Sequence, residues 1–273
     1  MNPQQGARAA GQRRSARSLP ATRPVVAVMS YNIQGYGALF SRRYIESVAR
    51  VIRKARPDVV GLQEVHRGTW AARFADQVEA LAELTGMEAV FGRSLLYRTG
   101  EYGNAVLTRG RVTSRQVHCL PGEAERRSLF HTRIELPGQP LDFYVTHLAA
   151  WGRLARSIRD RQARFIAELL EDTSNPFVLT GDFNAPLGAP ELETLRSSDR
   201  LHLCGRPGET THRFMRQRLD YIFANPAWRY LRSEVLRAGP SDHYPVVATL
   251  RLEDEAAAAP EVEEVEPMSA QAG

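Results

Sequence analysis

Short apolar runs separated by turn residues dominate this chain, and three longer stretches interrupt them. The longer stretches predict helices over residues 42–55, 69–85 and 153–171, and in the second of these Phe74, Val78, Leu81 and Leu84 fall on one face. The short runs are rich in β-branched residues and predict strands. We expect strands over residues 25–31, 58–62, 89–92, 103–109, 112–120, 128–136, 141–146, 177–180, 219–224 and 244–252.

The order of these elements predicts the fold class. Helices bracket a block of strands and further strands lie at both ends, which differs from the strict alternation of a doubly wound fold. We therefore expect an α/β sandwich with mixed, largely antiparallel sheets. No linker rich in Pro, Gly or Ser divides the middle, so residues 25–252 are expected to form one domain. Residues 1–24 and 253–273 are expected to be disordered tails.

Composition and charge narrow the picture only a little. The formal net charge is +5, with a basic N-terminal tail and an acidic C-terminal tail around a modestly basic centre. Such a centre suits a polyanionic substrate and ordinary solubility equally, and the near absence of Lys beside abundant Arg indicates codon bias. Two Cys exclude a disulfide framework and a Cys-based zinc site. We expect a cytoplasmic monomer, because no apolar run is long enough for a membrane span or an export signal.

Polar side chains close six of the apolar runs, and they are the candidate chemistry of the chain. They are too far apart in sequence for a local metal loop, but strands that share a sheet edge would bring them together. Carboxylate, amide and imidazole groups gathered in this way are typical of a divalent-metal phosphoesterase site. The residues are Asn32, Glu64, His147, Asp182, Asn184, Asp220, Asp242 and His243.

The segment Gly181-Asp182-Phe183-Asn184 carries the sharpest signal. In an extended segment, residues two apart project to the same side, so Asp182 could polarise a water while Asn184 donates a hydrogen bond to a phosphoryl oxygen. The competing interpretation is an Asx turn after a strand.

Glu64 and the histidines supply the remaining functions. Glu64 ends a strand where a hard divalent ion needs an anionic oxygen, and its alternative is a solvated loop glutamate. Asp220 and Asp242 are carboxylates that could orient His243 as a general base. His147 could stabilise a developing oxyanion. Surface or structural roles are expected for His66, His118, His131, His202 and His212, because none ends a strand beside another functional side chain.

Six motifs taken in order resemble the endonuclease/exonuclease/phosphatase family. They are Ser30-Tyr31-Asn32-Ile33, Leu62-Gln63-Glu64-Val65, Thr146-His147-Leu148, Gly181-Asp182-Phe183-Asn184, Leu219-Asp220-Tyr221-Ile222 and Ser241-Asp242-His243-Tyr244-Pro245. The resemblance implies a four-layered sandwich of two packed sheets flanked by helices, with Mg²⁺ or Mn²⁺ at one edge.

The same resemblance implies a role for each residue. Glu64 would be the main metal ligand, with Asn32 and Asp242 beside it. Asp182 and Asn184 would position the water and the phosphate, and His147 would contact the scissile phosphate. His243 would be the base, paired with Asp220.

Softer matches extend the site. Tyr102 and Asn104 resemble the Tyr-Gly-Asn segment of the family, and Arg127 resembles its strand arginine near the substrate. Arg126 competes for that role, and an exposed strand arginine is the alternative for either. Arg159 and Gln162 resemble the helix pattern of the family, although a solvated helix face is favoured there. Trp151 could stack on a base or pack beneath its loop.

The function expected from these residues is hydrolysis of a phosphate ester by in-line attack of an activated water. The stretch over residues 210–218 is basic and aromatic, which suits a nucleic-acid backbone, so cleavage of DNA or RNA is placed first. Phosphomonoesters and lipid or inositol phosphates are the alternatives, and a non-catalytic binding protein of the same fold is a third. Sphingomyelin is disfavoured because there is no long apolar insertion.

Overall fold

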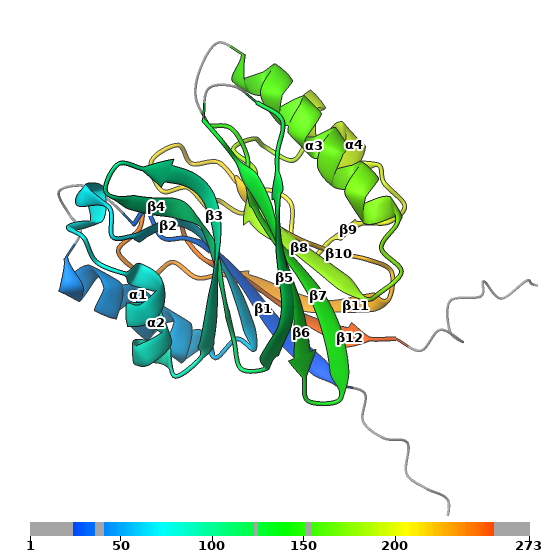
Figure 1. Cartoon of the computed structure of the whole chain (residues 1–273). Helices are drawn as coiled ribbons and strands as arrows, with labels where there is room; N and C mark the ends of the chain where they lie inside the picture. Colours follow the sequence, from blue (N-terminus) through cyan, green and yellow to red (C-terminus); the bar gives the residue numbers. More distant parts are fainter. Residues whose placement is uncertain (1–23, 36–40, 123–124, 151–153, 254–273) are drawn as a thin grey trace, which may run out of the picture.

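The computed structural model describes residues 24–35, 41–122, 125–150 and 154–253 (Figure 1). The predicted tails, apart from Pro24 and Glu253, and the stacking candidate Trp151 lie outside these ranges, so the expectations placed on them stay predictions. None of the helices in the described part of the chain has the length and apolar character that a membrane crossing needs.

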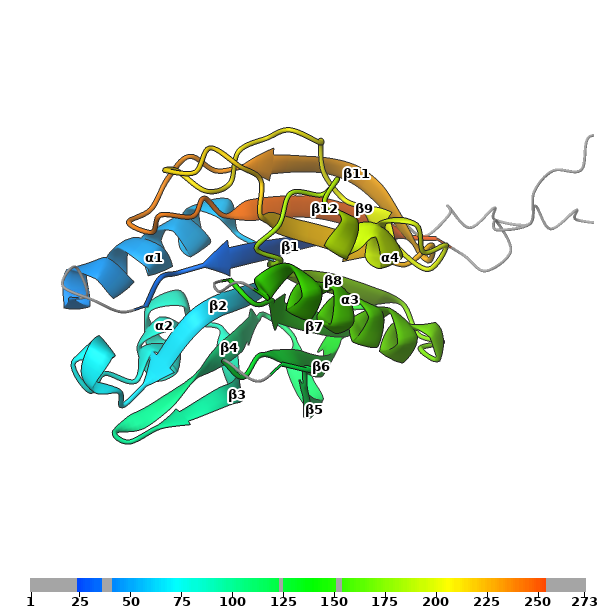
Figure 2. The same cartoon turned by 90° about the horizontal axis from the view of Figure 1, so that it is seen from above.

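Two six-stranded sheets form the centre of the molecule (Figures 1 and 2). The first has the order β11-β12-β1-β2-β4-β3, with β1 Val25–Asn32, β2 Val59–Arg67, β3 Glu88–Tyr97, β4 Gly100–Thr108, β11 Trp228–Val235 and β12 Val246–Leu252. The second has the order β5-β6-β7-β8-β10-β9, with β5 Arg111–Cys119, β6 Ser128–Leu136, β7 Gln139–His147, β8 Phe177–Asp182, β9 His202–Leu203 and β10 Asp220–Ala224. Each sheet has one parallel pair, β1 with β2 and β7 with β8, among antiparallel neighbours.

Helices cover the outer face of each sheet. The helices α1 (Arg42–Ala55) and α2 (Gln77–Thr85) lie on the first sheet, and α3 (Ala155–Glu171) with the short α4 (Glu193–Arg196) lies on the second (Figure 2). Alternation along β1 shows how the layers form, because Val26 and Val28 enter the core between the sheets while Met29 and Tyr31 pack under α1. The predicted sandwich is therefore confirmed, with four layers.

The predicted helix over residues 69–85 is wrong in its first half. A 3₁₀ turn, η1 (Trp70–Ala72), stands there, and Arg73 and Phe74 follow it with left-handed φ values of 52° and 62°. Asp76 then accepts hydrogen bonds from the N–H groups of residues 78 and 79 and begins α2. Phe74 is 62 % exposed instead of packing with the apolar face, because local capping interrupts the helical period.

Two strands and one short helix escape the sequence pattern. The strand β11 is an edge of the first sheet, so half of its residues are exposed and no continuous apolar run marks it. The strand β9 has two residues and α4 has four, which is too short for periodicity to reveal.

Candidate functional site

The polar residues predicted from the strand ends meet at one edge of the sandwich. In the second sheet His147 is registered with Asp182 across β7 and β8, and Asp182 is registered with Asp220 across β8 and β10. In the first sheet Asn32 ends β1 and is registered with Gln63 of the parallel strand β2. Strand pairing therefore places residues distant in sequence side by side.

Glu64 reaches the site through a β-bulge. The pairing of β2 with β4 shifts register between Leu62 and Val65, and Glu64 has a left-handed φ of 59°. A bulge of this kind turns one side chain away from the regular pleat, and its strain is typical of functional positions. Burial raises the pKa of Glu64 to about 7, although the hydrogen bond from Asn32 works against that rise.

Asn32 joins the two sheets. Its Nδ2 donates to Glu64 Oε1 and to Asp182 Oδ2, both at 3.0 Å, and its Oδ1 accepts the N–H of Gln34 at 3.0 Å. One amide therefore holds the two carboxylates in a fixed relation. Asn32 is fully buried, which restricts its side chain to this bridging position.

Asp182 is the centre of the cluster. Its Oδ2 lies 3.6 Å from His147 Nε2 and 3.6 Å from His243 Nε2. Burial raises the pKa of this carboxyl to about 6, with the nearby charge of His243 acting in the opposite direction. The group is therefore ionised at neutral pH and titrates just below it.

Asn184 lies in an Asx turn, which was the competing interpretation of this segment in the sequence. Its φ is 51°, and its N–H donates to Asp182 Oδ1 at 2.9 Å, which is an Asx turn. The expectation of an extended segment is therefore wrong at this residue. Its Nδ2 donates to the carbonyl oxygen of Leu148 at 3.0 Å, and Asn184 still lines the same cavity as Asp182.

His243 is held by Asp220 from behind. Its Nδ1 lies 2.8 Å from Asp220 Oδ2, which leaves Nε2 facing Asp182. Ser241 fixes the turn, because its hydroxyl donates to the carbonyl oxygen of Asn32 at 2.7 Å and accepts the N–H of His243 at 3.1 Å. Burial lowers the pKa of His243, but the charges of Asp220 and Asp182 outweigh it and raise the pKa to about 10.

His147 has a lowered pKa, in contrast to His243. Burial, together with the positive charges of Arg127 and His243, holds its pKa well below the usual value. Its Nδ1 lies 3.4 Å from the hydroxyl of Tyr102, which places that tyrosine at the site. The site therefore contains one neutral imidazole and one charged imidazole, separated by the Asp182 carboxylate.

Arg127 enters the site and Arg126 does not. Arg127 is 4 % exposed and lines the cavity, with Nη2 donating to Glu125 at 2.8 Å, whereas Arg126 is exposed. The Nε and Nη1 atoms of Arg127 are buried and have no hydrogen-bond partner among the described residues. Asn104, in contrast, donates to the carbonyl oxygens of Ser128 and Val145 and does not line the cavity, so its amide ties strands together.

The helix residues that resembled the family pattern brace the loop after β7. Arg159 donates to the carbonyl oxygen of Ala149 at 2.9 Å and pairs with Glu191 at 2.7 Å. Gln162 accepts the N–H of Ala149 at 3.0 Å and donates to the carbonyl oxygen of Pro121. These contacts hold the backbone beside His147. Arg159 and Gln162 therefore have a structural role, which differs from the solvated helix face that the sequence favoured.

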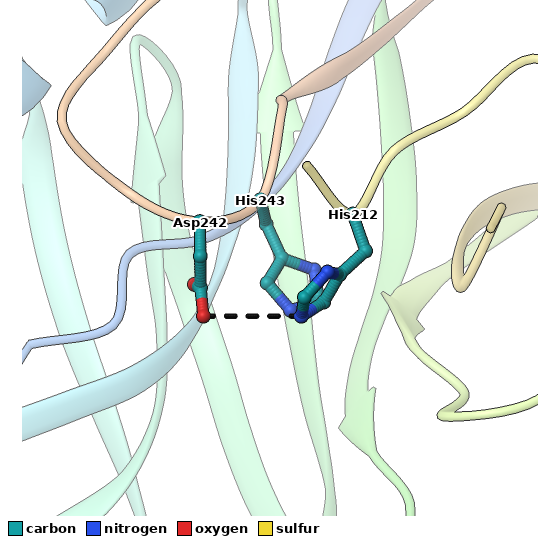
Figure 3. Close-up of side chains that lie close together, drawn as sticks. All are labelled: His212, Asp242 and His243. Carbon is teal, nitrogen blue, oxygen red and sulfur yellow. Dashed lines mark ion pairs between the residues drawn. The ribbon is translucent and has the colours of Figure 1, made fainter. Parts of the chain in front are cut away.

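His212 belongs to the site, although the sequence predicted a surface or structural role. Its ring lies 4.7 Å from that of His243, centroid to centroid, and its Nε2 lies 3.8 Å from Asp242 Oδ2 (Figure 3). An isolated β-bridge between His212 and His243 places it there. The available signal was its position in the basic and aromatic stretch over residues 210–218.

The spacing of His212, Asp242 and His243 resembles a metal site, as does that of Asp182, Asp220 and His243. The backbone N–H of Met215 donates to His212 Nδ1 at 3.1 Å, so the neutral ring carries its proton on Nε2. A metal-bound imidazole instead donates from its other nitrogen. His212 is thus a hydrogen-bond donor beside Asp242 and is unsuited to bind a metal.

A cavity of about 560 Å³ opens over the cluster. Glu64, Asp182, His147, Arg127 and Asp242 line it, among other residues. Within the described residues, Glu64 Oε2 is enclosed and has no hydrogen-bond partner. An orphaned, buried carboxylate oxygen fits a hard divalent cation, with Asn32 and Asp242 as its neighbours.

A family model described as "Endonuclease/Exonuclease/phosphatase family" matches residues 29–243, which spans every strand end of the site. The chain belongs to this family. The resemblance drawn from the six motifs is confirmed. The family includes nucleases, phosphodiesterases and phosphatases, which hydrolyse phosphate esters and generally depend on a divalent metal.

The chain is also similar to individual proteins and solved structures. The chain is 28 % identical over 264 residues to the Escherichia coli K12 "Uncharacterized protein YbhP", covering 82 % of this chain and 96 % of that protein. It is 26 % identical to an endonuclease/exonuclease/phosphatase from Beutenbergia cavernae, with a TM-score of 0.69 and coverage of 85 % and 72 %. The fold is shared with a Bacteroides thetaiotaomicron mannosyl-6-phosphatase, at 20 % identity, a TM-score of 0.66 and coverage of 82 % and 99 %.

Proposed function

We propose that this protein is a divalent-metal-dependent phosphodiesterase that cleaves DNA or RNA by in-line attack of an activated water, with Mg²⁺ or Mn²⁺ as its ion. One observation carries the proposal. Glu64 and Arg127 line the same cavity. Among the described residues, Glu64 Oε2 and Arg127 Nε and Nη1 are buried and have no hydrogen-bond partner. The Glu64 carboxylate suits a metal cation and the Arg127 guanidinium suits a phosphate anion, so the cavity could bind a phosphate together with its metal.

Glu64 and Asp242 would hold the ion, which supplies positive charge to the phosphoryl oxygens when bound. Asn32 was predicted beside them, but its Oδ1 accepts the N–H of Gln34 and its Nδ2 donates to Glu64, so it would position Glu64 instead. Arg127 would donate to a non-bridging phosphate oxygen, because its Nε and Nη1 have no hydrogen-bond partner among the residues that the structure describes. Asn184 would position the phosphate, as the resemblance implied. His147 is neutral, so it would act as a hydrogen-bond partner of the phosphate without adding charge.

Asp182 would accept the proton of the attacking water. Its Oδ1 is fixed by the N–H of Asn184, and its Oδ2 lies between the two imidazoles. A carboxylate whose pKa is raised to about 6 by burial is ionised at neutral pH and still basic enough to take a proton.

His243 would serve as a proton donor in this scheme. A pKa of about 10, raised by Asp220 and Asp182 against the effect of burial, keeps its imidazole protonated at neutral pH. A protonated ring stabilises a phosphate oxygen or a leaving group, whereas the family resemblance led to the prediction of a base. The two roles give opposite pH dependences when Asp220 is changed.

The Asp220→Asn variant is expected to move the alkaline limb of the kcat/KM profile to lower pH. Loss of the Asp220 charge removes the largest of the three charge attractions that raise the pKa of His243, while the charges of Asp182 and Asp242 remain. A proton donor would then be lost at lower pH, so the alkaline limb falls earlier. If His243 were the base, the acid limb would move to lower pH instead. Measurement of kcat/KM from about pH 5 to 10 in both proteins separates the roles.

The proposal is tested on a substrate panel. Purified protein should hydrolyse bis-p-nitrophenyl phosphate and single-stranded DNA or RNA with Mg²⁺ or Mn²⁺ and lose that activity in EDTA. The phosphomonoester p-nitrophenyl phosphate and mannose 6-phosphate serve as the competing class, since one protein with this fold is described as a mannosyl-6-phosphatase. Faster turnover of the monoesters would replace the phosphodiesterase assignment with a phosphatase. Metal-dependent turnover of none of them would favour the non-catalytic alternative.

Two further expectations accompany the proposal. The cytoplasmic location and the monomeric state predicted from the sequence are retained here as parts of it. Fractionation of cells and light scattering of the purified chain measure them directly.

A further inference from the structure

Large aromatic and apolar side chains stand exposed around the catalytic cavity. Trp70 is 75 % exposed, Met215 49 % and Tyr97 45 %, and all three line the cavity that holds Asp182. A tryptophan that remains so exposed contributes little to folding. Exposed apolar groups concentrated at a pocket mark a surface that binds something.

The backbone that carries Trp70 is fixed. Its N–H donates to Thr99 Oγ1 at 2.9 Å, which ties η1 to the turn between β3 and β4. The ends of the same loop are joined by an isolated bridge between Arg67 and Asp76, and the two side chains form an ion pair at 2.9 Å. A ring displayed on a fixed backbone binds a partner with little loss of conformational entropy.

Tyr97 is likewise supported from behind. Its ring is stacked with His66 at 6.4 Å between centroids, with 7° between the planes, and meets the ring of Tyr102 at 6.3 Å. Tyr102 in turn lies beside His147. The Tyr97 ring is therefore connected, through the packed ring of Tyr102, with the floor of the cavity on which the phosphate is expected. We call Trp70 and Tyr97 the aromatic wall.

We propose that the aromatic wall is a stacking subsite for one planar ring of the substrate, a nucleobase attached to the phosphate held by Arg127 and the metal. This inference rests on the proposed function and narrows its substrate class. Base–aromatic stacking needs exposed rings, which the wall provides. Arg98 and Thr99 line the same cavity and offer polar partners for the edge of a base, whereas an alkyl chain would use none. A volume of about 560 Å³ accommodates a nucleotide-sized group.

The test compares two phosphates that differ only in the base. AMP and ribose 5-phosphate are titrated calorimetrically, with Mg²⁺ present, into full-length Asp182→Asn protein so that neither is consumed. AMP is expected to bind at least about fivefold more tightly, as stacking of one base predicts. Adding Trp70→Ala should bring the two affinities within about twofold by weakening AMP alone. Phe74→Ala is the matched control, because Phe74 is an exposed aromatic of the same loop that does not line the cavity, and it should leave the AMP preference intact.

Other outcomes overturn the inference. Equal affinity for AMP and ribose 5-phosphate before Trp70 is changed would show that the wall binds no base. An equal loss of affinity for AMP and for ribose 5-phosphate in the Trp70→Ala variant would indicate that Trp70 has a structural role. Sedimentation with phosphatidylglycerol vesicles that depends on Trp70, without a preference for AMP, would identify the wall as a membrane contact. A Trp70-dependent AMP preference in a protein whose wild type cleaves nothing on the panel would support the subsite and sink the proposed function.

Discussion

Asp182→Asn is expected to lower the turnover of the phosphodiester by about 10²–10⁴-fold, the range for loss of a positioned general base. The amide oxygen can still accept the N–H of Asn184. The NH2 group that replaces Oδ2 can neither accept the hydrogen bond of Asn32 nor take the proton of the water. Steady-state kinetics with Mg²⁺ or Mn²⁺ give the turnover, and thermal unfolding gives the stability.

The stability of the same variant should not fall together with its turnover. Burial raises the pKa of Asp182 above its usual value, so the ionised group at neutral pH costs folding free energy. A neutral amide removes that cost, which offsets the hydrogen bond lost from Asn32, and the melting temperature is expected to stay close to that of the wild type. A large fall in melting temperature would mean that the lost turnover reports unfolding.

Asp142→Asn is the matched control for this experiment. Asp142 is a buried carboxylate on β7, paired with His131 at 3.0 Å and Arg133 at 3.1 Å. Burial alone would raise its pKa, but the hydrogen bond and charge of His131 and the charge of Arg133 lower it. Its replacement should therefore cost stability, about 1–3 kcal/mol, and leave turnover close to wild type. Equal turnover losses in the two variants would refute a special role for Asp182.

Glu64→Gln is expected to weaken Mn²⁺ binding by more than about 100-fold, the upper end of what loss of an outer-shell partner costs a metal site. The reason is the orphaned Oε2, which becomes a neutral amide atom in a cavity that offers no replacement carboxylate at the same bulge. Titration calorimetry of Mn²⁺ into the metal-free protein measures the affinity, and turnover should fall in parallel.

Glu125→Gln provides the comparison for Glu64. Glu125 lines the same cavity, but its carboxylate is already engaged with Arg127 at 2.8 Å. Its variant should bind Mn²⁺ within about threefold of wild type, since one paired surface carboxylate contributes little. Mn²⁺ binding that survives Glu64→Gln unchanged would move the metal to another donor set.

The strand ends were the part of the site that the sequence could reveal. Asn32, His147 and Asp182 each close an apolar run and Asp220 begins one. Strand pairing carries them to one edge, so local pattern was enough to find them. Glu64 was also found because it follows an apolar run. The direction of its side chain, however, depends on a β-bulge, which the alternation of side chains along a strand does not predict.

Contacts between distant segments were beyond that pattern. His212 follows no strand, and only its bridge to His243 brings it to Asp242. Arg127 and Arg126 are neighbours in sequence, and burial alone decided between them. The break after Trp70 was missed because capping by Thr69 and Asp76 acts over a few residues and overrides the helical period.

By itself, the sequence determined the α/β sandwich through its apolar periodicity and the family through the resemblance of six motifs. The residues in those motifs also supplied most of the candidate site. The tertiary structure decided which nitrogen of His212 carries the proton, which pKa values rise or fall, and which aromatic rings stand exposed beside the cavity. Burial, charge and ring contacts arise only when segments far apart in the chain are packed together, so no local pattern encodes them.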